Sequence, residues 1–282
     1  MRLATDNNFF QFILFYSRKI IASEISICQS IFEIPDVFRH PGLQRAIGKA
    51  RFTHTDAVMT GEVVSLRAHD GHVLSAYQAR PDKPPRGGLV LLQEIFGVTR
   101  HIRRVCDGYA AQGYHVVAPA LFDRVRPGIE LGYSKEDAAT GRDLRSKLPW
   151  DQVFADVIAA KAQLSGSGKI ATLGYCWGGT IAWRSAVHVD GVAAAVCYYG
   201  TQIGPFIAEK PRCAVLMHFG ESDPIATLDH AGQLRAAQGA QVEIQVYPAS
   251  HGFNCDEIAS FHQPSAALAL RRSLEFLAAH IG

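Results

Sequence analysis

The segment of the chain with the clearest chemical potential is a glycine-rich turn at residues 174–179, G-Y-C-W-G-G. It follows the apolar run Lys169–Leu173 and precedes a segment of helical character, so Cys176 falls on a predicted strand-to-helix turn. The spacing G-x-C-x-G matches the nucleophile elbow G-x-S-x-G, with sulfur in place of oxygen. Small residues on both sides leave room for a strained backbone, and a helix start favours a thiolate. The turn predicts a nucleophile at Cys176; an inert buried cysteine is the alternative.

Two downstream residues could complete a catalytic triad with Cys176. Asp223 follows the predicted strand Ala214–Phe219 in the loop G-E-S-D-P, and His251 follows the predicted strand Val242–Tyr247. The chain order nucleophile, acid, histidine is that of α/β-hydrolases. We therefore expect His251 to take and return the thiol proton, while Asp223 fixes the tautomer of the ring.

Other residues compete for the acid and base roles. Glu221 and Asp229 are alternatives to Asp223, although we expect Asp229 to face outward from a helix. His218 lies inside a predicted strand and is a weaker candidate for the base. Taken singly, Asp-Pro is a common turn and His-Gly a common loop, so the argument depends on all three residues appearing in order.

A second loop, Q-E-I-F-G at residues 93–97, follows the apolar run Gly88–Gln93. In an α/β-hydrolase the loop after an early strand supplies the second oxyanion N–H, so we expect the N–H of Ile95 to act with that of Trp177. The adjacent carboxylate of Glu94 would oppose formation of a thiolate, which predicts a controlling role for it. A solvated loop carboxylate is the alternative.

Together these motifs, with G-x-x-D-P at 220–224 and S-H-G-F at 250–253, resemble the dienelactone hydrolase (carboxymethylenebutenolidase) family over about residues 60–280. The resemblance implies a cysteine hydrolase without a cofactor that opens unsaturated lactones in the degradation of chlorocatechols and related aromatic compounds. It also implies that Glu94 restrains the resting thiol and takes its proton when substrate binds. Cys176 would then attack the carbonyl, and the ring-opened enolate would help to hydrolyse the acyl-enzyme.

The chain departs from the family pattern where the substrate carboxylate binds. Family members hold it with a Ser directly after the catalytic histidine and an Arg four positions after it, whereas this chain has Gly252 and Cys255 there. The third carboxylate-binding residue of the family is an arginine that lies before the elbow helix, and Arg142 is its loosely aligned counterpart in this chain. Phe253 is a further candidate for substrate contact. Each lost charge-assisted contact is worth roughly 1.5–3 kcal/mol, so the class of reaction carries over better than the substrate.

The order of the predicted elements brings these residues to one edge of a sheet. Strands are expected at 63–66, 73–79, 88–93, 115–118, 169–173, 191–199, 214–219 and 242–247, and helices at 102–112, 153–163, 178–187, 228–238 and 264–279. Residues 120–150 are expected to form a long excursion. This alternation predicts an α/β fold of the α/β-hydrolase kind, with a mainly parallel central sheet flanked by helices and a site beyond the carboxyl ends of the strands.

The composition is that of an ordinary globular protein, because 48% of the 282 residues are hydrophobic and 19% are charged. With a net charge of +2 and no long apolar run, neither a nucleic acid nor a membrane is an expected partner. Six cysteines without a C-x-x-C pair predict free thiols in a reducing cytoplasm. No H-E-x-x-H, Cys/His cluster or phosphate-binding glycine loop is present, so we expect no metal and no cofactor.

Residues 1–58 differ in composition from the rest, being rich in Ile, Phe, Ser and Asn at the start, whereas Ala, Gly, Val and Arg dominate after Met59. Asp6 and Glu24 argue against a signal or transit peptide. We expect an extension outside the catalytic fold, followed by a catalytic domain over 59–282.

Three functional hypotheses follow from these observations. The leading one is a cytoplasmic cysteine hydrolase of small-molecule esters or lactones, dienelactone-hydrolase-like, acting as a monomer or small homo-oligomer. The second is a general carboxylesterase or thioesterase without dienelactone activity. The third is a non-catalytic binding protein on the same fold, against which the ordered nucleophile, acid and base argue.

Overall fold

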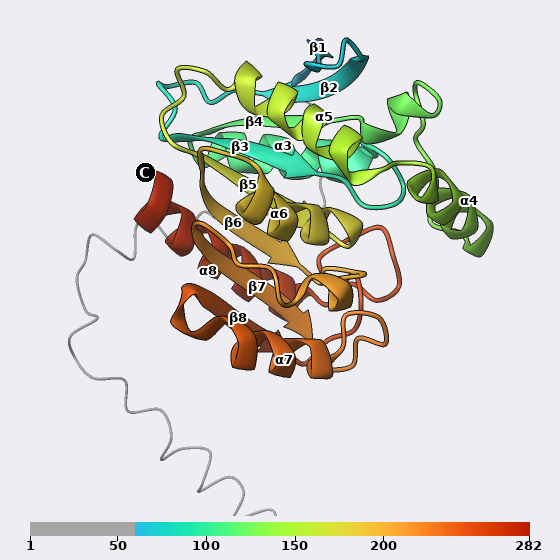
Figure 1. Ribbon diagram of the computed structural model, residues 1–282, viewed down its shortest axis with the longest axis vertical. Coiled ribbons are helices and arrows are strands. Elements are labelled where there is room, and N and C mark those ends of the chain that lie inside the picture. Colours follow the sequence, from blue (N-terminus) through green and yellow to red (C-terminus); the bar gives the residue numbers. More distant parts are fainter. Residues whose placement is uncertain (1–59) are drawn as a thin grey trace, which may run out of the picture. The chain divides into compact units, whose positions relative to one another are not determined.

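The computed structural model describes residues 60–282, so the predicted extension at 1–58 lies outside the described residues. A single eight-stranded sheet has the order β1-β2-β4-β3-β5-β6-β7-β8 (Figure 1). Its strands are β1 (Glu62–Arg67), β2 (Val73–Ala79), β3 (Gly87–Leu92), β4 (Tyr114–Pro119), β5 (Ile170–Tyr175), β6 (Val192–Tyr198), β7 (Ala214–Gly220) and β8 (Val242–Tyr247). The β1–β2 and β2–β4 pairs are antiparallel and the other pairs are parallel. The predicted, mainly parallel sheet is confirmed.

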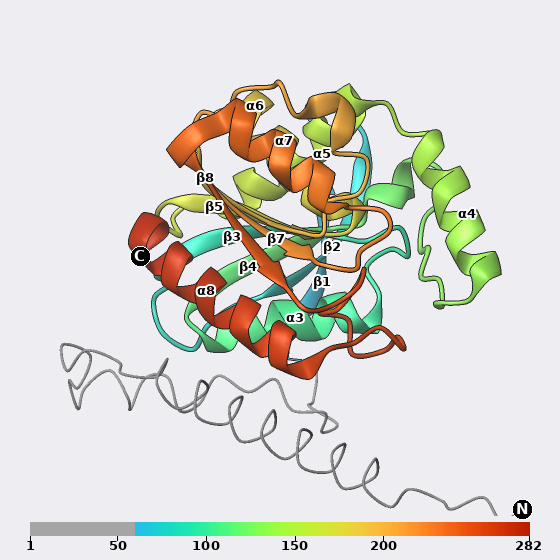
Figure 2. The same ribbon diagram turned by 90° about the horizontal axis from the view of Figure 1, so that it is seen from below.

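Helices cover both faces of the sheet (Figure 2). The helices α3 (Arg100–Ala111) and α8 (Gln263–Ile281) lie on one face, and α5 (Trp150–Gln163), α6 (Trp177–His188) and α7 (Leu228–Gln238) lie on the other. Because both faces are covered, the central strands are mainly apolar and mostly buried, and β3 and β4 have no exposed residue. Among residues 60–282, no helix is long and apolar enough to cross a membrane.

The expected excursion at 120–150 contains a helix that the sequence did not predict, α4 (Lys135–Ser146). Its residues are mainly polar, and its two buried positions are Gly141 and Leu144, so it lacks a broad apolar stripe. A capping box at Ser134 and Asp137 starts it. The helix packs closely on the loop after β3: a Cβ at Gly141 would lie 2.0 Å from the carbonyl oxygen of Ile95. α4 is therefore part of the surroundings of the candidate site.

Candidate active site

Cys176 lies at the junction of β5 and α6, on a sharply turned backbone. Its φ is +55°, in the region that favours glycine, and conformations of this kind cost on the order of 1–3 kcal/mol at a non-glycine residue. The flanking glycines make the turn sterically feasible, because a Cβ at Gly174 would lie 2.0 Å from the carbonyl oxygen of Gly178. A Cβ at Gly178 would lie 2.2 Å from the carbonyl oxygen of Leu92 at the end of β3. The local geometry is that of a nucleophile elbow.

The structure brings Cys176, His251 and Asp223 together from the carboxyl ends of three strands. The sulfur of Cys176 lies 3.4 Å from Nε2 of His251, and Nδ1 of that ring lies 2.8 Å from Oδ2 of Asp223. The other carboxylate oxygen of Asp223 accepts the N–H groups of Ile225 and Ala226, at 2.8 and 2.9 Å. These bonds hold the carboxylate in one orientation, so the imidazole has a fixed partner on each side.

Electrostatics favour a charged imidazole at His251. Burial alone would lower the pKa of His251, but the carboxylate of Asp223 and the sulfur of Cys176 outweigh it and raise the pKa to about 10. At neutral pH the ring therefore holds both protons, and Nε2–H donates toward the sulfur. A cationic donor at this distance stabilises a thiolate.

The two predicted oxyanion donors lie on adjoining elements. Ile95 stands at a corner of the tight turn formed by the Glu94–Gly97 bridge, and Trp177 is the first residue of α6. At both positions the N–H faces no acceptor within the turn or the helix. The close packing of Gly178 on the end of β3 brings the two backbones together. Trp177 is held by stacking on Phe122, with ring centroids 5.7 Å apart.

Glu94 is buried, with 3% of its surface exposed, so the solvated-loop alternative is wrong. Burial raises the pKa of its carboxyl group, while the charges of His101 and His251 act in the opposite direction. The sulfur of Cys176 has hydrogen bonds to His251 and Thr201, and none joins it to Glu94 within the described residues. In this conformation the sulfur of Cys176 is paired with His251 and not with the carboxylate of Glu94.

Two residues of the site escaped the sequence analysis. Thr201 lies with its hydroxyl 3.9 Å from the sulfur of Cys176, and its N–H donates to the carbonyl oxygen of Cys176 at 3.2 Å. Tyr199 has a φ of +38° and packs edge-on against the His251 ring, with centroids 5.1 Å apart. Both residues lie just after the carboxyl end of β6, where the sequence analysis had placed no site residue. Residues at such strand ends are candidates for the site, and this position could have revealed them.

The structure shows where the two residues predicted to contact substrate lie. Arg142 is exposed on α4, whereas Arg145, three residues later, is half-buried and close enough to interact electrostatically with Cys176. Burial lowers the pKa of Arg145, and within residues 60–282 no carboxylate forms a salt bridge with it. Phe253 is fully buried and packs against Tyr199 and other rings, so it supports the wall of the site from behind.

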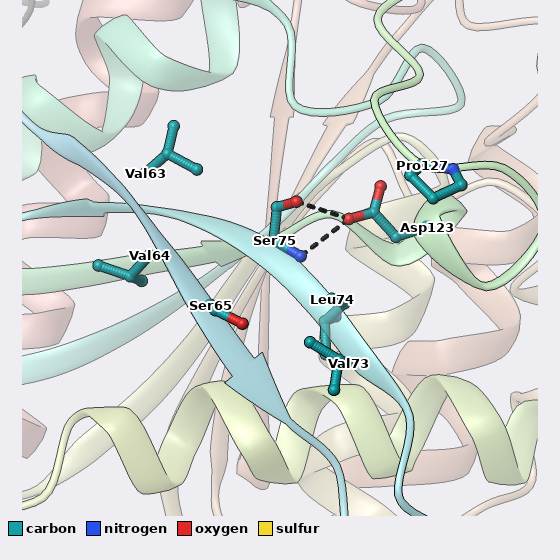
Figure 3. A pocket seen from close by; sticks show the side chains of 8 residues that line it. All are labelled: Val63, Val64, Ser65, Val73, Leu74, Ser75, Asp123 and Pro127. Atoms are coloured by element: carbon teal, nitrogen blue, oxygen red, sulfur yellow. Dashed lines mark hydrogen bonds between the residues drawn. The ribbon is translucent and has the colours of Figure 1, made fainter.

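A surface cavity of about 350 Å³ lies away from these residues, along β1 and β2 (Figure 3). Two of its polar residues already bind each other, because the N–H and the hydroxyl of Ser75 both donate to Asp123 at 2.8 Å. It offers no paired nucleophile and base. Nor does any group of three His, Cys, Asp or Glu side chains in residues 60–282 have the arrangement of a metal site.

The sheet order, the elbow and the positions of the acid and histidine define an α/β-hydrolase fold. Residues 74–281 match the dienelactone hydrolase family, and the chain belongs to that family. It is 36% identical over 230 residues to a Yersinia pestis protein named "Putative carboxymethylenebutenolidase", covering 74% of this chain and 85% of that protein. It is 32% identical over 237 residues to a carboxymethylenebutenolidase of Pseudomonas putida, covering 78% and 97%. A Klebsiella pneumoniae crystal structure named "Putative Dienelactone Hydrolase" superposes with a TM-score of 0.65 at 30% identity, covering 77% of this chain and 99% of that chain.

Proposed function

We propose that the protein is a cysteine-dependent hydrolase of ester or lactone bonds, with Cys176 as nucleophile, His251 as acid and base, and Asp223 as the residue that orients the ring. The observation that carries this proposal is a continuous chain of hydrogen bonds through the His251 ring. The sulfur of Cys176 lies 3.4 Å from Nε2 of that ring, and Nδ1 lies 2.8 Å from the carboxylate of Asp223. A binding protein without chemistry has no need of a strained cysteine joined to an Asp–His pair.

In the proposed reaction the Cys176 thiolate attacks the substrate carbonyl carbon and forms a C–S bond, while the carbonyl oxygen becomes an oxyanion. The N–H groups of Ile95 and Trp177 stabilise that charge. When the C–O bond breaks, the proton on Nε2 of His251 passes to the leaving alkoxide. Water then attacks the thioester carbonyl carbon, and His251 accepts a proton from it. The C–S bond breaks, which releases the acid product and restores the Cys176 thiolate.

The charges near the sulfur bear on the choice of substrate. Gly252 and Cys255 offer no cation, so Arg145 on α4 is the residue we assign to an anionic group of the substrate. One arginine supplies a single charge-assisted contact worth roughly 1.5–3 kcal/mol. We therefore expect the protein to hydrolyse neutral activated esters as well as dienelactones. Its preference for the anionic substrate should be smaller than three such contacts would give.

The test is turnover of a neutral nitrophenyl ester and of a dienelactone by the wild type and by Cys176→Ala. We expect the variant to lose activity on both, and mass spectrometry of the quenched wild type to find the acyl group on the Cys176 peptide. Cys213→Ala is the matched control, because Cys213 is the more exposed thiol and lies outside the triad. Retained turnover by Cys176→Ala would refute the proposal.

A further inference from the structure

Gln93 is a fully buried side chain that the reaction described above does not use, and it follows β3 directly. Its amide oxygen accepts the backbone N–H of Leu121 at 3.0 Å, and its amide nitrogen donates to the carbonyl oxygen of Glu94 at 3.2 Å. Because the first partner can only donate and the second can only accept, these two groups fix the orientation of the amide. One side chain therefore ties the segment after β4 to the loop after β3.

The bond to Glu94 reaches the peptide unit that carries a predicted oxyanion donor. The carbonyl of Glu94 and the N–H of Ile95 belong to one planar trans peptide, so the two groups point in opposite directions. A donor that holds the Glu94 carbonyl on one side therefore aims the Ile95 N–H toward the other side. Rotation of this peptide about its two flanking single bonds would redirect the N–H and would break the bond to Gln93.

The segment that binds Gln93 also supports the other predicted donor. Leu121 begins the short helical turn Leu121–Arg124, and the next residue, Phe122, stacks on Trp177 with 13° between the ring planes. Both Leu121 and Phe122 are buried, so this turn is part of the core beneath the site. The same turn therefore holds Trp177 through a ring contact and the loop after β3 through the Gln93 amide.

We infer that Gln93 is a positioning residue of the oxyanion hole: its amide fixes the plane of the Glu94–Ile95 peptide and so aims the Ile95 N–H at the charge that develops on the substrate oxygen. A purely structural role would be to satisfy the N–H of Leu121, which starts a helical turn and has no acceptor within it. That role needs an acceptor only, and it does not account for the bond to Glu94. Because the oxyanion belongs to the acyl transfer, this inference rests on the proposed function.

The experiment compares two reactions of Cys176 in the wild type and in Gln93→Met, which keeps the length of the side chain and removes both hydrogen bonds. Hydrolysis of a neutral nitrophenyl ester forms an oxyanion, whereas alkylation by iodoacetamide is a displacement at a saturated carbon and forms none. We expect kcat/KM for the ester to fall by about 10- to 100-fold, less than the loss of about 10²–10³-fold on removing a donor, because the N–H remains but is misdirected. The rate of alkylation should not change. An unchanged kcat/KM, or an equal fall in both rates, would overturn the inference.

A second readout measures the oxyanion hole without turnover. A trifluoromethyl ketone adds to the Cys176 thiolate: a C–S bond forms, and the carbonyl oxygen takes the negative charge, as in the transition state of the ester reaction. A stable mimic of that state should lose affinity in proportion to the loss of kcat/KM. We therefore expect the inhibition constant of the ketone to rise in Gln93→Met by the same factor by which kcat/KM falls. An inhibition constant equal to that of the wild type would contradict the role assigned to Gln93.

The matched control is Gln78→Met. Gln78 is also buried, but it lies on β2, where its amide binds the side chains of Glu62 and Gln163 at 3.1 and 2.9 Å. This variant should keep the wild-type kcat/KM, and a fall equal to that of Gln93→Met would overturn the inference.

If Gln93→Met does not fold, Gln93→Glu replaces it. A protonated carboxyl group can serve both partners of Gln93, whereas the ionised group has no hydrogen for the carbonyl of Glu94. Its kcat/KM relative to the wild type should fall between about pH 5 and pH 10, a range that covers the upward shift of a buried carboxyl group, and a constant ratio would overturn the inference. Cys176→Ala tests the proposed function separately: if it lost turnover while Gln93→Met kept the wild-type kcat/KM, the role of Gln93 alone would be refuted.

Discussion

Replacing Asp223 by asparagine tests the proposed triad at the point where its geometry is most constrained. Oδ1 of Asp223 accepts two backbone N–H groups, from Ile225 and Ala226. An amide introduced at this position keeps its oxygen on those donors and must turn its NH2 group toward Nδ1 of His251. The ring then has to accept a hydrogen bond at Nδ1, which is the wrong tautomer for a base at Nε2.

The structure gives the size of the expected effect. Raising the pKa of His251 from 6.5 to about 10 corresponds to roughly 5 kcal/mol of preference for the charged ring, to which Asp223 and Cys176 both contribute. Half of that is about 2–3 kcal/mol, which agrees with a hydrogen bond between charged groups. Asp223→Asn should therefore lower kcat by about 30- to 150-fold at least. A fully misplaced tautomer would extend the loss toward about 10⁴-fold, as in a Ser-His-Asp triad.

The assay is kcat on a neutral nitrophenyl ester, together with the pH dependence of Cys176 alkylation. The alkylation profile should lose the plateau that a cationic His251 maintains below about pH 10. Asp123→Asn is the control, because Asp123 is also buried and accepts hydrogen bonds from Ser75 and Gly128, but it lines the surface cavity along β1 and β2. If Asp223→Asn kept kcat within threefold of the wild type, with the Asp123 variant equally active, the assigned role of Asp223 would be refuted.

Three further predictions concern other parts of the chain. Burial raises the pKa of Glu94 in the folded protein above its value in the unfolded chain, so the free energy of unfolding falls as pH rises between these two pKa values. In urea titrations, Glu94→Gln should therefore gain stability relative to the wild type as pH rises. A difference in stability that stays constant with pH would contradict this. Arg145→Met should raise KM for a dienelactone about tenfold or more while leaving a neutral ester unchanged, and Arg142→Met should affect neither; equal effects on both substrates would exclude an anion site at Arg145. We propose that residues 1–58 lie outside the catalytic fold, so a chain beginning at Met59 should keep the thermal midpoint and kcat of the full chain; an insoluble or inactive product would contradict this.

The parts of the site that the sequence predicted are those in which local chemistry fixes the geometry. The glycines around Cys176 are required wherever a nucleophile stands on a strand-to-helix turn, and the apolar strands before Asp223 and His251 end where the side chains must emerge. Both facts can be read from a few consecutive residues. The chain order then limits how those loops meet at one edge of the sheet.

The parts of the site that the sequence did not predict depend on contacts between distant segments. α4 has only two buried residues, so no apolar periodicity revealed it, and its arginines could not be ranked until its buried side was known. Phe253 lies two positions after the histidine, but the turn at Gly252, with a φ of +75°, sends it into the core. His101 joins Asp256 across 155 positions of sequence, and no local pattern marks such a pair.

The candidate triad is embedded in the core whereas α4 lies at its edge, and this difference affects substrate choice. The elbow and the triad are embedded in the core, where Gly178 has no room for a Cβ and Asp223 has no freedom to turn, so substitutions there cost both stability and chemistry. Arg145 stands on a helix that contacts the core mainly through Ala138, Gly141 and Leu144, and the exposed residues of α4 can change without disturbing the sheet. Under the proposed function, the charge that α4 presents to the substrate can therefore vary while the reaction stays the same. Exchanging α4 between family members should transfer preference for anionic or neutral substrates without transferring kcat on a neutral ester.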